Sequence, residues 1–430
     1  MASPDRGIER IDDAVDWFES DATGGGAGAL PFREIVDGIW AQDIQYGTGN
    51  ALSIRTDDGI VQVDTGIEAD HARGMIDKLR SVSDDPIFAL VYSHGHTAYN
   101  HGVEAWLEHC EERGDPRPQI VGHRNVLHRY GRYRQTQPWL ERVTEWQFGF
   151  PPDSIVGTHM FEVLVDPDVT YIDDLTLTTA GRTVQLVHCH AETDDGTALW
   201  LPDDGVLYGA NATIGSFPNI GSPLRSPRDP RAWADQLDSY LQYDAEILIR
   251  EYGPEIVGAE TVREMLTTVR DALRWLRRET LERMNAGMVI EDVVNDIEYP
   301  EEFASSPWMP ETYGCAEYVI REVWRIEAGW WDRNITSVHP APSAESTNAV
   351  LDAITDKAAV LAAARGHLDR GEPQLGLHVV DLLAMAGGDS PEVVEARKLK
   401  AEIAAALADD TPTYMSENYY RAVAAGHPAR

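Results

Sequence analysis

The chain has 430 residues, of which 43% are hydrophobic, so it can form about two or three domains with full cores. It carries 72 acidic against 36 basic residues, a formal net charge of −36. A surface this negative repels nucleic acid backbones and anionic membrane surfaces, so neither is expected as a partner. The three cysteines lie far apart and form no CxxC motif or disulfide framework, which favours a reducing compartment.

Residues 1–31 read as an extension ahead of the folded part. They contain no apolar core of a signal peptide, and no run of about 18 apolar residues occurs in the sequence. A cytoplasmic protein without a membrane-spanning segment is therefore expected. The acidic composition fits either adaptation to concentrated salt or a codon bias, and both explanations stay open.

Short β runs alternate with helical segments over residues 32 to 260. Helices are predicted at 67–81 and 103–113, and strands at 34–40, 51–56, 59–64, 87–92, 119–121, 175–179, 183–188, 198–201, 206–208 and 246–249. Strands with interleaved helices, some joined by hairpins, predict an α/β layered domain.

From residue 260 onward the pattern is helical. Helices are predicted at 262–284, 311–326, 346–369, 374–385 and 391–407. The last of these has Ser390 as N-cap and Pro391 at its first position, a strong start signal. Helix pairs of this kind suggest an assembly surface. The predicted organisation is an extension over 1–31, an α/β domain over 32–285 and a helical domain over 286–430.

The first segment that carries chemistry follows a buried strand. Residues 90–93, Leu-Val-Tyr-Ser, lead directly into His94-Gly95-His96. Strand ends in layered α/β folds face the crevice where ligands bind, and two imidazoles two residues apart can point at one cation. A polar strand-to-helix turn would contain the same residues, so this motif alone leaves a metal site and a structural turn both open.

A second polar segment follows another predicted strand. Residues 188–195 offer two imidazoles, a thiol and three carboxylates. By itself the segment is equally a polar turn with capping Asp and Thr side chains.

Taken together, these segments resemble the metallo-β-lactamase fold. The resemblance rests on Val63-Asp64-Thr65-Gly66, on the His-Gly-His motif that ends at His96, and on Ala191-Glu192-Thr193. Residues 329–334, Gly-Trp-Trp-Asp-Arg-Asn, resemble the start of the dimerisation domain that the alkylsulfatase branch adds. The resemblance implies a metallo-β-lactamase-like αββα sandwich of the α/β class, followed by an α-helical dimerisation domain, and hence a homodimer.

The resemblance also implies a two-metal site, of which this chain keeps one half. His94, His96 and Glu192 stand at positions that serve the first metal in the family. The positions that serve the second metal and the bridge hold other residues, Ala98, Tyr99, Ala210 and Tyr252. One divalent metal, zinc or iron(II), is therefore expected at the first position. A gapped alignment would make His101 or His190 an alternative ligand.

The remaining candidate residues surround this expected metal. Tyr99, Asp195 and Tyr252 are candidates for acid–base catalysis. Arg132, in an Arg- and Tyr-rich segment, and Asn211 are candidates for substrate binding.

Three functions fit these residues. The favoured one is a mononuclear metal-dependent hydrolase resembling alkylsulfatases, in which water activated by the metal attacks an ester of a small, partly apolar, anionic substrate. A non-haem Fe(II) enzyme that uses O2 would need the same two histidines and one glutamate. The third is a metal-free ligand-binding or assembly protein.

Overall fold

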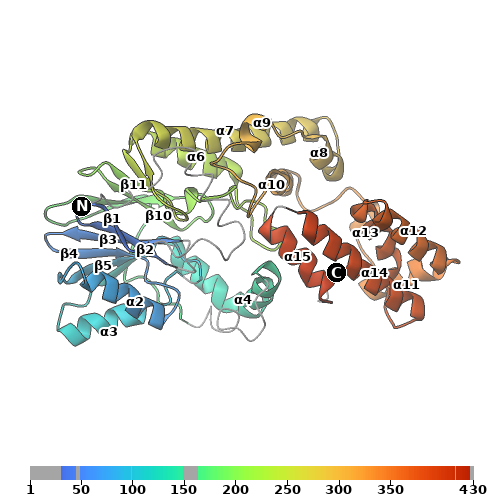
Figure 1. Cartoon of the computed structure of the whole chain (residues 1–430), viewed down its shortest axis with the longest axis horizontal. Coiled ribbons are helices and arrows are strands. Elements are labelled where there is room, and N and C mark those ends of the chain that lie inside the picture. The colour runs from blue at the N-terminus through green and yellow to red at the C-terminus, as the bar shows by residue number, and fades with distance from the viewer. Residues whose placement is uncertain (1–30, 45–48, 98, 149–162, 412, 427–430) are drawn as a thin grey trace. The chain divides into compact units, whose positions relative to one another are not determined.

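The computed structural model describes residues 31–44, 49–97, 99–148, 163–411 and 413–426 (Figure 1). The chain divides into two compact units, one of residues up to Glu141 together with Pro152–Ile326, the other of Arg142–Pro151 with Glu327–Arg430. Residues 1–30 of the predicted extension lie outside the described part.

Two β-sheets form the centre of the first unit. In the described residues the first sheet has the order β1-β2-β3-β4-β5-β6-β7 and the second the order β13-β12-β11-β10-β9-β8. The strands of the first are β1 (Arg33–Val36), β2 (Ile39–Asp43), β3 (Asn50–Thr56), β4 (Gly59–Val63), β5 (Ile87–Val91), β6 (Gln119–His123) and β7 (Val169–Tyr171). Those of the second are β8 (Asp174–Leu177), β9 (Val184–Cys189), β10 (Gly196–Leu201), β11 (Val206–Tyr208), β12 (Ile247–Ile249) and β13 (Ile256–Val257).

Side-chain alternation along the first sheet builds a core on each of its faces. Leu52 and Ile54 of β3 belong to a core that also contains Leu199 of β10, whereas Ala51 belongs to a second core with Met75. Successive strand residues point to opposite faces, so one sheet contributes to both cores. The first core lies between the sheets, and the second lies under the helices of the outer face.

Helices cover the outer face of each sheet. On the first sheet these are α2 (Ala69–Arg80), α3 (Val103–Arg113) and α4 (Asn125–Phe148), and on the second α6 (Pro230–Leu241) and α7 (Ala259–Asn285). The predicted αββα sandwich is thus confirmed (Figure 1).

Helical segments continue the first unit past the sandwich. The helices α8 (Ile290–Asp296), α9 (Glu301–Ala304) and α10 (Ala316–Ala328) follow α7, and Val293 and Val319 belong to the first core, which continues from between the sheets to residues of α6 and α7. The predicted domain boundary between residues 285 and 286 separates two segments that resemble different domains in sequence. The compact units are defined by packing, so the boundary stays a prediction.

The second unit is helical, as predicted. It contains α11 (Ser343–Ala353), α12 (Lys357–Asp369), α13 (Pro373–Ala384), α14 (Pro391–Asp410) and α15 (Tyr414–Ala424) around a small core with Val380, Leu399 and Ile403. The side chain of Ser390 caps α14 by accepting the N–H of Val393. No helix in the described ranges is long and apolar enough to cross a bilayer.

Two local predictions were wrong, and one helix was not predicted. The strand expected at 34–40 is a hairpin, because the backbone at Gly38 has φ of 74° and turns between β1 and β2. The helix expected at 346–369 is two helices, because Asp356 caps a new one by accepting the N–H of Ala359 at 2.9 Å. The Arg- and Tyr-rich segment, to which no element was assigned, lies in α4.

Candidate metal centre

The His-Gly-His motif lies directly after β5 and is held from both sheets. The N–H of Ser93 donates to Oδ1 of Asp64, which follows β4, at 2.8 Å. The carbonyl oxygen of Ser93 accepts the N–H of Thr197 in β10 at 2.6 Å. The turn that presents His94 is thereby fixed between the two sheets.

Further hydrogen bonds fix the turn itself. The amide of Asn100 donates to Oδ1 of Asp64 and to the carbonyl oxygen of His94, both at 3.2 Å. The N–H of Gly95 donates to Oδ2 of Asp195 at 2.9 Å. A Cβ at position 95 would lie 2.8 Å from that oxygen, so the close approach requires glycine.

His94, His96 and Glu192 come together, as the sequence predicts. One ligand atom from each lies within 4.8 Å of the others. His94 and His96 come from the turn after β5, and Glu192 comes from the loop between β9 and β10. The two imidazole rings lie 4.5 Å apart, centroid to centroid, in an edge-on arrangement.

These residues fit a divalent cation. Nε2 of His94 is buried and has no hydrogen-bond partner among the described residues, while Nδ1 lies 2.9 Å from Oγ of Ser93. Burial lowers the pKa of His94 to about 3 and that of His96 well below its usual value, so both rings are neutral. Metal ligation requires neutral imidazoles.

Glu192 is held by two side chains that the sequence did not single out. Its Oε1 accepts from Nη1 of Arg228 and from Nδ2 of Asn219, each at 2.8 Å. Arg228 is itself fixed, because its backbone N–H donates to Oε1 of Glu322 at 2.6 Å. The carboxylate charge of Glu192 is therefore opposed by a buried guanidinium group.

Tyr99 and Tyr252, two of the predicted catalytic residues, lie beside Glu251, which was not among the residues predicted from the sequence. The hydroxyl of Tyr99 donates to Oε1 of Glu251 and also contacts the hydroxyl of Tyr252. Oε1 of Glu251 lies 3.8 Å from Nε2 of His94. Burial raises the pKa of both tyrosines and of Glu251 well above their usual values. Both phenols are therefore neutral hydrogen-bond donors.

Asp195, the third predicted catalytic residue, forms a buried ion pair. Its Oδ2 accepts Nε of Arg129 at 2.8 Å as well as the N–H of Gly95. Burial alone would raise the pKa of Asp195, but the charges of Arg129 and His94 and the hydrogen bonds from Thr193 and Arg129 together bring the value down to about 2. A carboxylate this acidic is a weak base, so the geometry favours a positioning role for Asp195.

The two predicted substrate-binding residues lie in unlike surroundings. Arg132 is exposed on α4, with its guanidinium carbon 5.2 Å from the ring centre of Tyr133. Asn211 is buried, donates to Oγ1 of Thr193 at 2.7 Å and accepts from Sγ of Cys189 at 3.2 Å. Neither side chain is part of the three-residue ligand group.

The two alternative ligands also lie outside that group. His101 bonds the backbone of Ile67, in the turn that precedes α2. His190 is exposed, and its ring lies 6.1 Å from that of His188. Among the described residues, the ligand group therefore follows the ungapped alignment.

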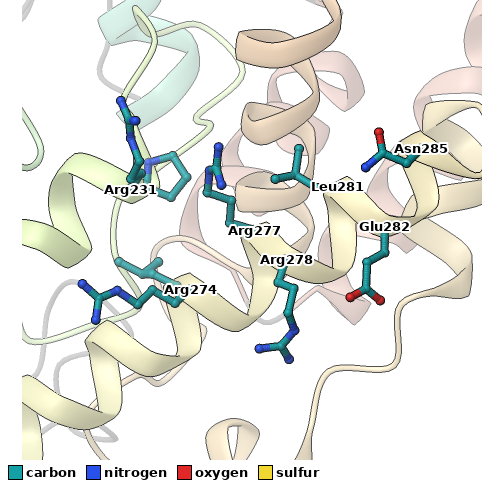
Figure 2. Close-up of a pocket in the computed structure, with 9 residues that line it drawn as sticks. Arg231, Arg274, Arg277, Arg278, Leu281, Glu282 and Asn285 are labelled. Carbon is teal, nitrogen blue, oxygen red and sulfur yellow. The ribbon is translucent and has the colours of Figure 1, made fainter.

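A cavity of about 350 Å³ lies elsewhere, where α6 and α7 meet (Figure 2). It is rich in arginine, but these side chains have acidic partners: Arg274 pairs with Asp238, and Arg278 with Glu279. Figure 2 shows Arg274, Arg277 and Arg278 pointing in different directions from α7. The cavity shares no residue with the ligand group.

Both parts of the fold match known families. The model of the metallo-beta-lactamase superfamily matches residues 45–250, and that of the alkyl sulfatase dimerisation domain matches residues 289–427. The chain joins a metallo-β-lactamase domain to an alkyl sulfatase dimerisation domain. The predicted family resemblance is thus confirmed.

Individual relatives agree with this assignment. The chain is 29% identical over 341 residues to a linear primary-alkylsulfatase of Pseudomonas sp., covering 75% of this chain and 63% of that protein. It is 24% identical to an (R)-specific secondary-alkylsulfatase of Pseudomonas sp., covering 86% and 58%. The solved structure of the inverting sec-alkylsulfatase Pisa1 from Pseudomonas sp. superimposes with a TM-score of 0.79 at 22% identity, covering 94% of this chain and 66% of that one. The chain thus spans about 60% of the length of the two curated relatives.

Proposed function

We propose that this protein is a hydrolase that uses one divalent metal ion, held by His94, His96 and Glu192. The proposal is carried by the convergence of three ligand atoms within 4.8 Å, one of them the unpartnered Nε2 of His94. Two histidines and one carboxylate leave positions open for water and substrate, as in catalytic zinc sites. When bound, the ion would supply Lewis acidity and lower the pKa of water.

The proposed substrate is an ester of a small, partly apolar, anionic molecule, with alkyl sulfates as the first class to test. The names of the curated relatives support sulfate esters. Of the arginines whose charges act on His96, Arg129 and Arg228 are already paired with Asp195 and Glu192, so the anionic character of the substrate is proposed from the relatives.

The surrounding residues would orient the substrate and the turn. Tyr252 is half-buried whereas Tyr99 is buried, so of the two phenols Tyr252 is the one we assign to the substrate. It would donate a hydrogen bond to the anion or to the leaving group. Asp195 would hold the turn between the two histidines through Gly95.

We further propose that the protein acts as a homodimer. The support is the dimerisation model that matches residues 289–427. Two-fold dimers are the commonest assemblies of soluble proteins.

The test is sulfate release from linear alkyl sulfates of increasing chain length, compared between the wild type and a His94→Ala, His96→Ala double variant. The wild type should release sulfate and the double variant should not. A matched control replaces His128 and His339, both exposed, by alanine and should retain activity. Full activity in the His94, His96 variant would refute the proposal. Bound iron with O2 uptake and no ester hydrolysis would instead support an oxygen-dependent enzyme.

A further inference from the structure

We infer that Glu251 is a fourth ligand of the proposed metal ion, and that Tyr99 and Tyr252 hold its carboxylate in place. The site would then contain two histidines and two glutamates, and water or substrate would enter a fifth coordination position. The inference depends on the proposed function only in requiring that a metal ion binds at His94, His96 and Glu192.

The distance between Glu251 and His94 suits a shared ion. Oε1 of Glu251 lies 3.8 Å from Nε2 of His94, and both side chains are buried. Zinc bonds to nitrogen and oxygen are about 2.0–2.2 Å long, so two ligands of one ion lie at most about 4.2 Å apart. One ion can therefore contact both atoms. Glu251 lies outside the group of three whose ligand atoms are all within 4.8 Å of one another, so its side chain would have to turn toward His96 and Glu192 to complete the site.

Two buried polar atoms lack partners at this place. In the part of the chain that the structure describes, neither Nε2 of His94 nor Oε2 of Glu251 has a hydrogen-bond partner. Leaving a buried polar group unsatisfied destabilises the fold, so such a pair needs an explanation. In the tautomer in which Nδ1 of His94 donates to Oγ of Ser93, Nε2 presents a lone pair, and a cation would satisfy it together with the carboxylate.

A second carboxylate would help to balance the charge of a bound ion. Arg228 lies 2.8 Å from Oε1 of Glu192 and offsets its charge, and imidazoles that ligate a metal are neutral. The three ligands with Arg228 thus supply no net negative charge. A dication in a buried site needs compensating charge to offset its desolvation. Glu251 supplies that charge.

The surroundings of Glu251 fix it as a preformed ligand. Its backbone N–H donates to the carbonyl oxygen of Thr213 at 2.9 Å, and its carbonyl oxygen accepts the N–H of Asn50 at 2.8 Å. The hydroxyl of Tyr99 donates to its carboxylate, and Tyr252 contacts that hydroxyl. Hydrogen bonds of this kind orient metal-bound carboxylates in other proteins.

The experiment titrates metal-free protein with Zn²⁺ in competition with a chromophoric chelator. Glu251→Gln keeps the size of the side chain and an acceptor for Tyr99 but removes the charge. We expect it to weaken zinc affinity by about 100-fold or more, and Tyr252→Phe to weaken it by about tenfold. The control Glu255→Gln changes a buried glutamate of the same loop that pairs with Arg33, and it should bind zinc within about twofold of the wild type.

Co²⁺ substitution separates direct ligation from an indirect effect. The visible absorption bands of bound Co²⁺ should change in Glu251→Gln and stay as in the wild type in Glu255→Gln. If Glu251→Gln fails to fold, Glu251→Asp keeps the charge but shortens the reach, and it should also change the spectrum and lower the affinity.

Wild-type affinity and an unchanged spectrum in the Glu251 variants would overturn the inference, and so would a wild-type chain that takes up no metal. Ester hydrolysis is scored separately. A wild type that binds one ion through Glu251 but hydrolyses no ester would refute the proposed function and leave this inference standing.

Discussion

Nε of Arg129 donates to Oδ2 of Asp195 at 2.8 Å, and the same oxygen accepts the N–H of Gly95 at 2.9 Å. A buried ion pair thereby fixes the residue between the two candidate metal ligands His94 and His96. The pair couples α4 to the loop that also carries Glu192, so elements far apart in sequence set the geometry of one site.

Asp195→Asn should destabilise the protein by up to about 3–5 kcal/mol, because the buried guanidinium of Arg129 would keep only the more exposed carboxylate of Asp194, 3.0 Å away, as a counter-charge. Urea unfolding measures the loss. An Arg129→Gln, Asp195→Asn double variant should lose less than the sum of the two single variants. If Asp195→Asn were as stable as the wild type but lost the acidic limb of its pH–rate profile, Asp195 would be a base and not a positioning residue.

Asp64 should make the stability of the fold depend on pH. Burial raises the pKa of Asp64 to about 7, although hydrogen bonds from Ser93 and Asn100 act in the opposite direction. The folded state binds the proton of the Asp64 carboxyl more tightly than the unfolded chain does. The contribution of this difference to the free energy of unfolding is fully present below about pH 4 and is lost as the pH rises to 7.

Asp64→Asn tests this prediction. The asparagine side chain is neutral at every pH, and asparagine tolerates the positive φ of 56° at this position. Relative to the wild type, its free energy of unfolding should rise by about 3 kcal/mol between pH 5 and pH 8. The measurement is the free energy of unfolding in urea at both pH values. An equal difference between the two proteins at pH 5 and pH 8 would contradict the prediction.

Restoring the family's second set of ligands should restore a second metal. The substitutions are Ala98→Asp, Tyr99→His, Ala210→Asp and Tyr252→His, of which the first lies outside the described residues. Ala210 has φ of 45°, a conformation that aspartate adopts more readily than alanine, so the backbone there suits the change. Metal content should rise from about one to about two ions per chain, whereas Ala210→Asp alone should leave it at one. No rise would mean that the residues are aligned wrongly with the family motif.

The dimer should depend on exposed apolar side chains near the start of the second unit. Trp330 is 77% exposed and Ile335 is 78% exposed. Large apolar groups in solvent mark interaction sites when they are clustered. Trp330→Ala with Ile335→Ser should weaken dimerisation at least about tenfold in sedimentation experiments. Ile172→Ser, which changes an exposed residue of the first unit, is the control, and equal dimer stability in both variants would contradict the prediction.

Local patterns were sufficient to predict most of the fold. The helix at 103–113 and the strand at 206–208 have the predicted bounds, because apolar periodicity and flanking turns define both. The length of α4 was not predicted, because it contains Pro138 and lacks a clear apolar stripe. Here tertiary packing outweighs local preference.

The site residues that could be predicted from the sequence are those that follow a predicted strand within a recognisable motif. His94, His96 and Glu192 sit in such positions and converge. Glu251 also follows a strand, but with 72 acidic residues in the chain a single glutamate gives no signal by itself. Arg132 was predicted in place of Arg129 on the family resemblance alone, because nothing in the local sequence distinguishes the two. The partner that buries Arg129 is Asp195, 66 residues away, and a contact of that range is not visible in the sequence.

The most direct test of the account is elemental analysis of the protein purified without a metal-binding tag. The wild type should contain about one zinc or iron ion per chain, and the His94→Ala, His96→Ala variant almost none. Two ions per wild-type chain, or full metal content in the double variant, would contradict a single site built on these two histidines and Glu192.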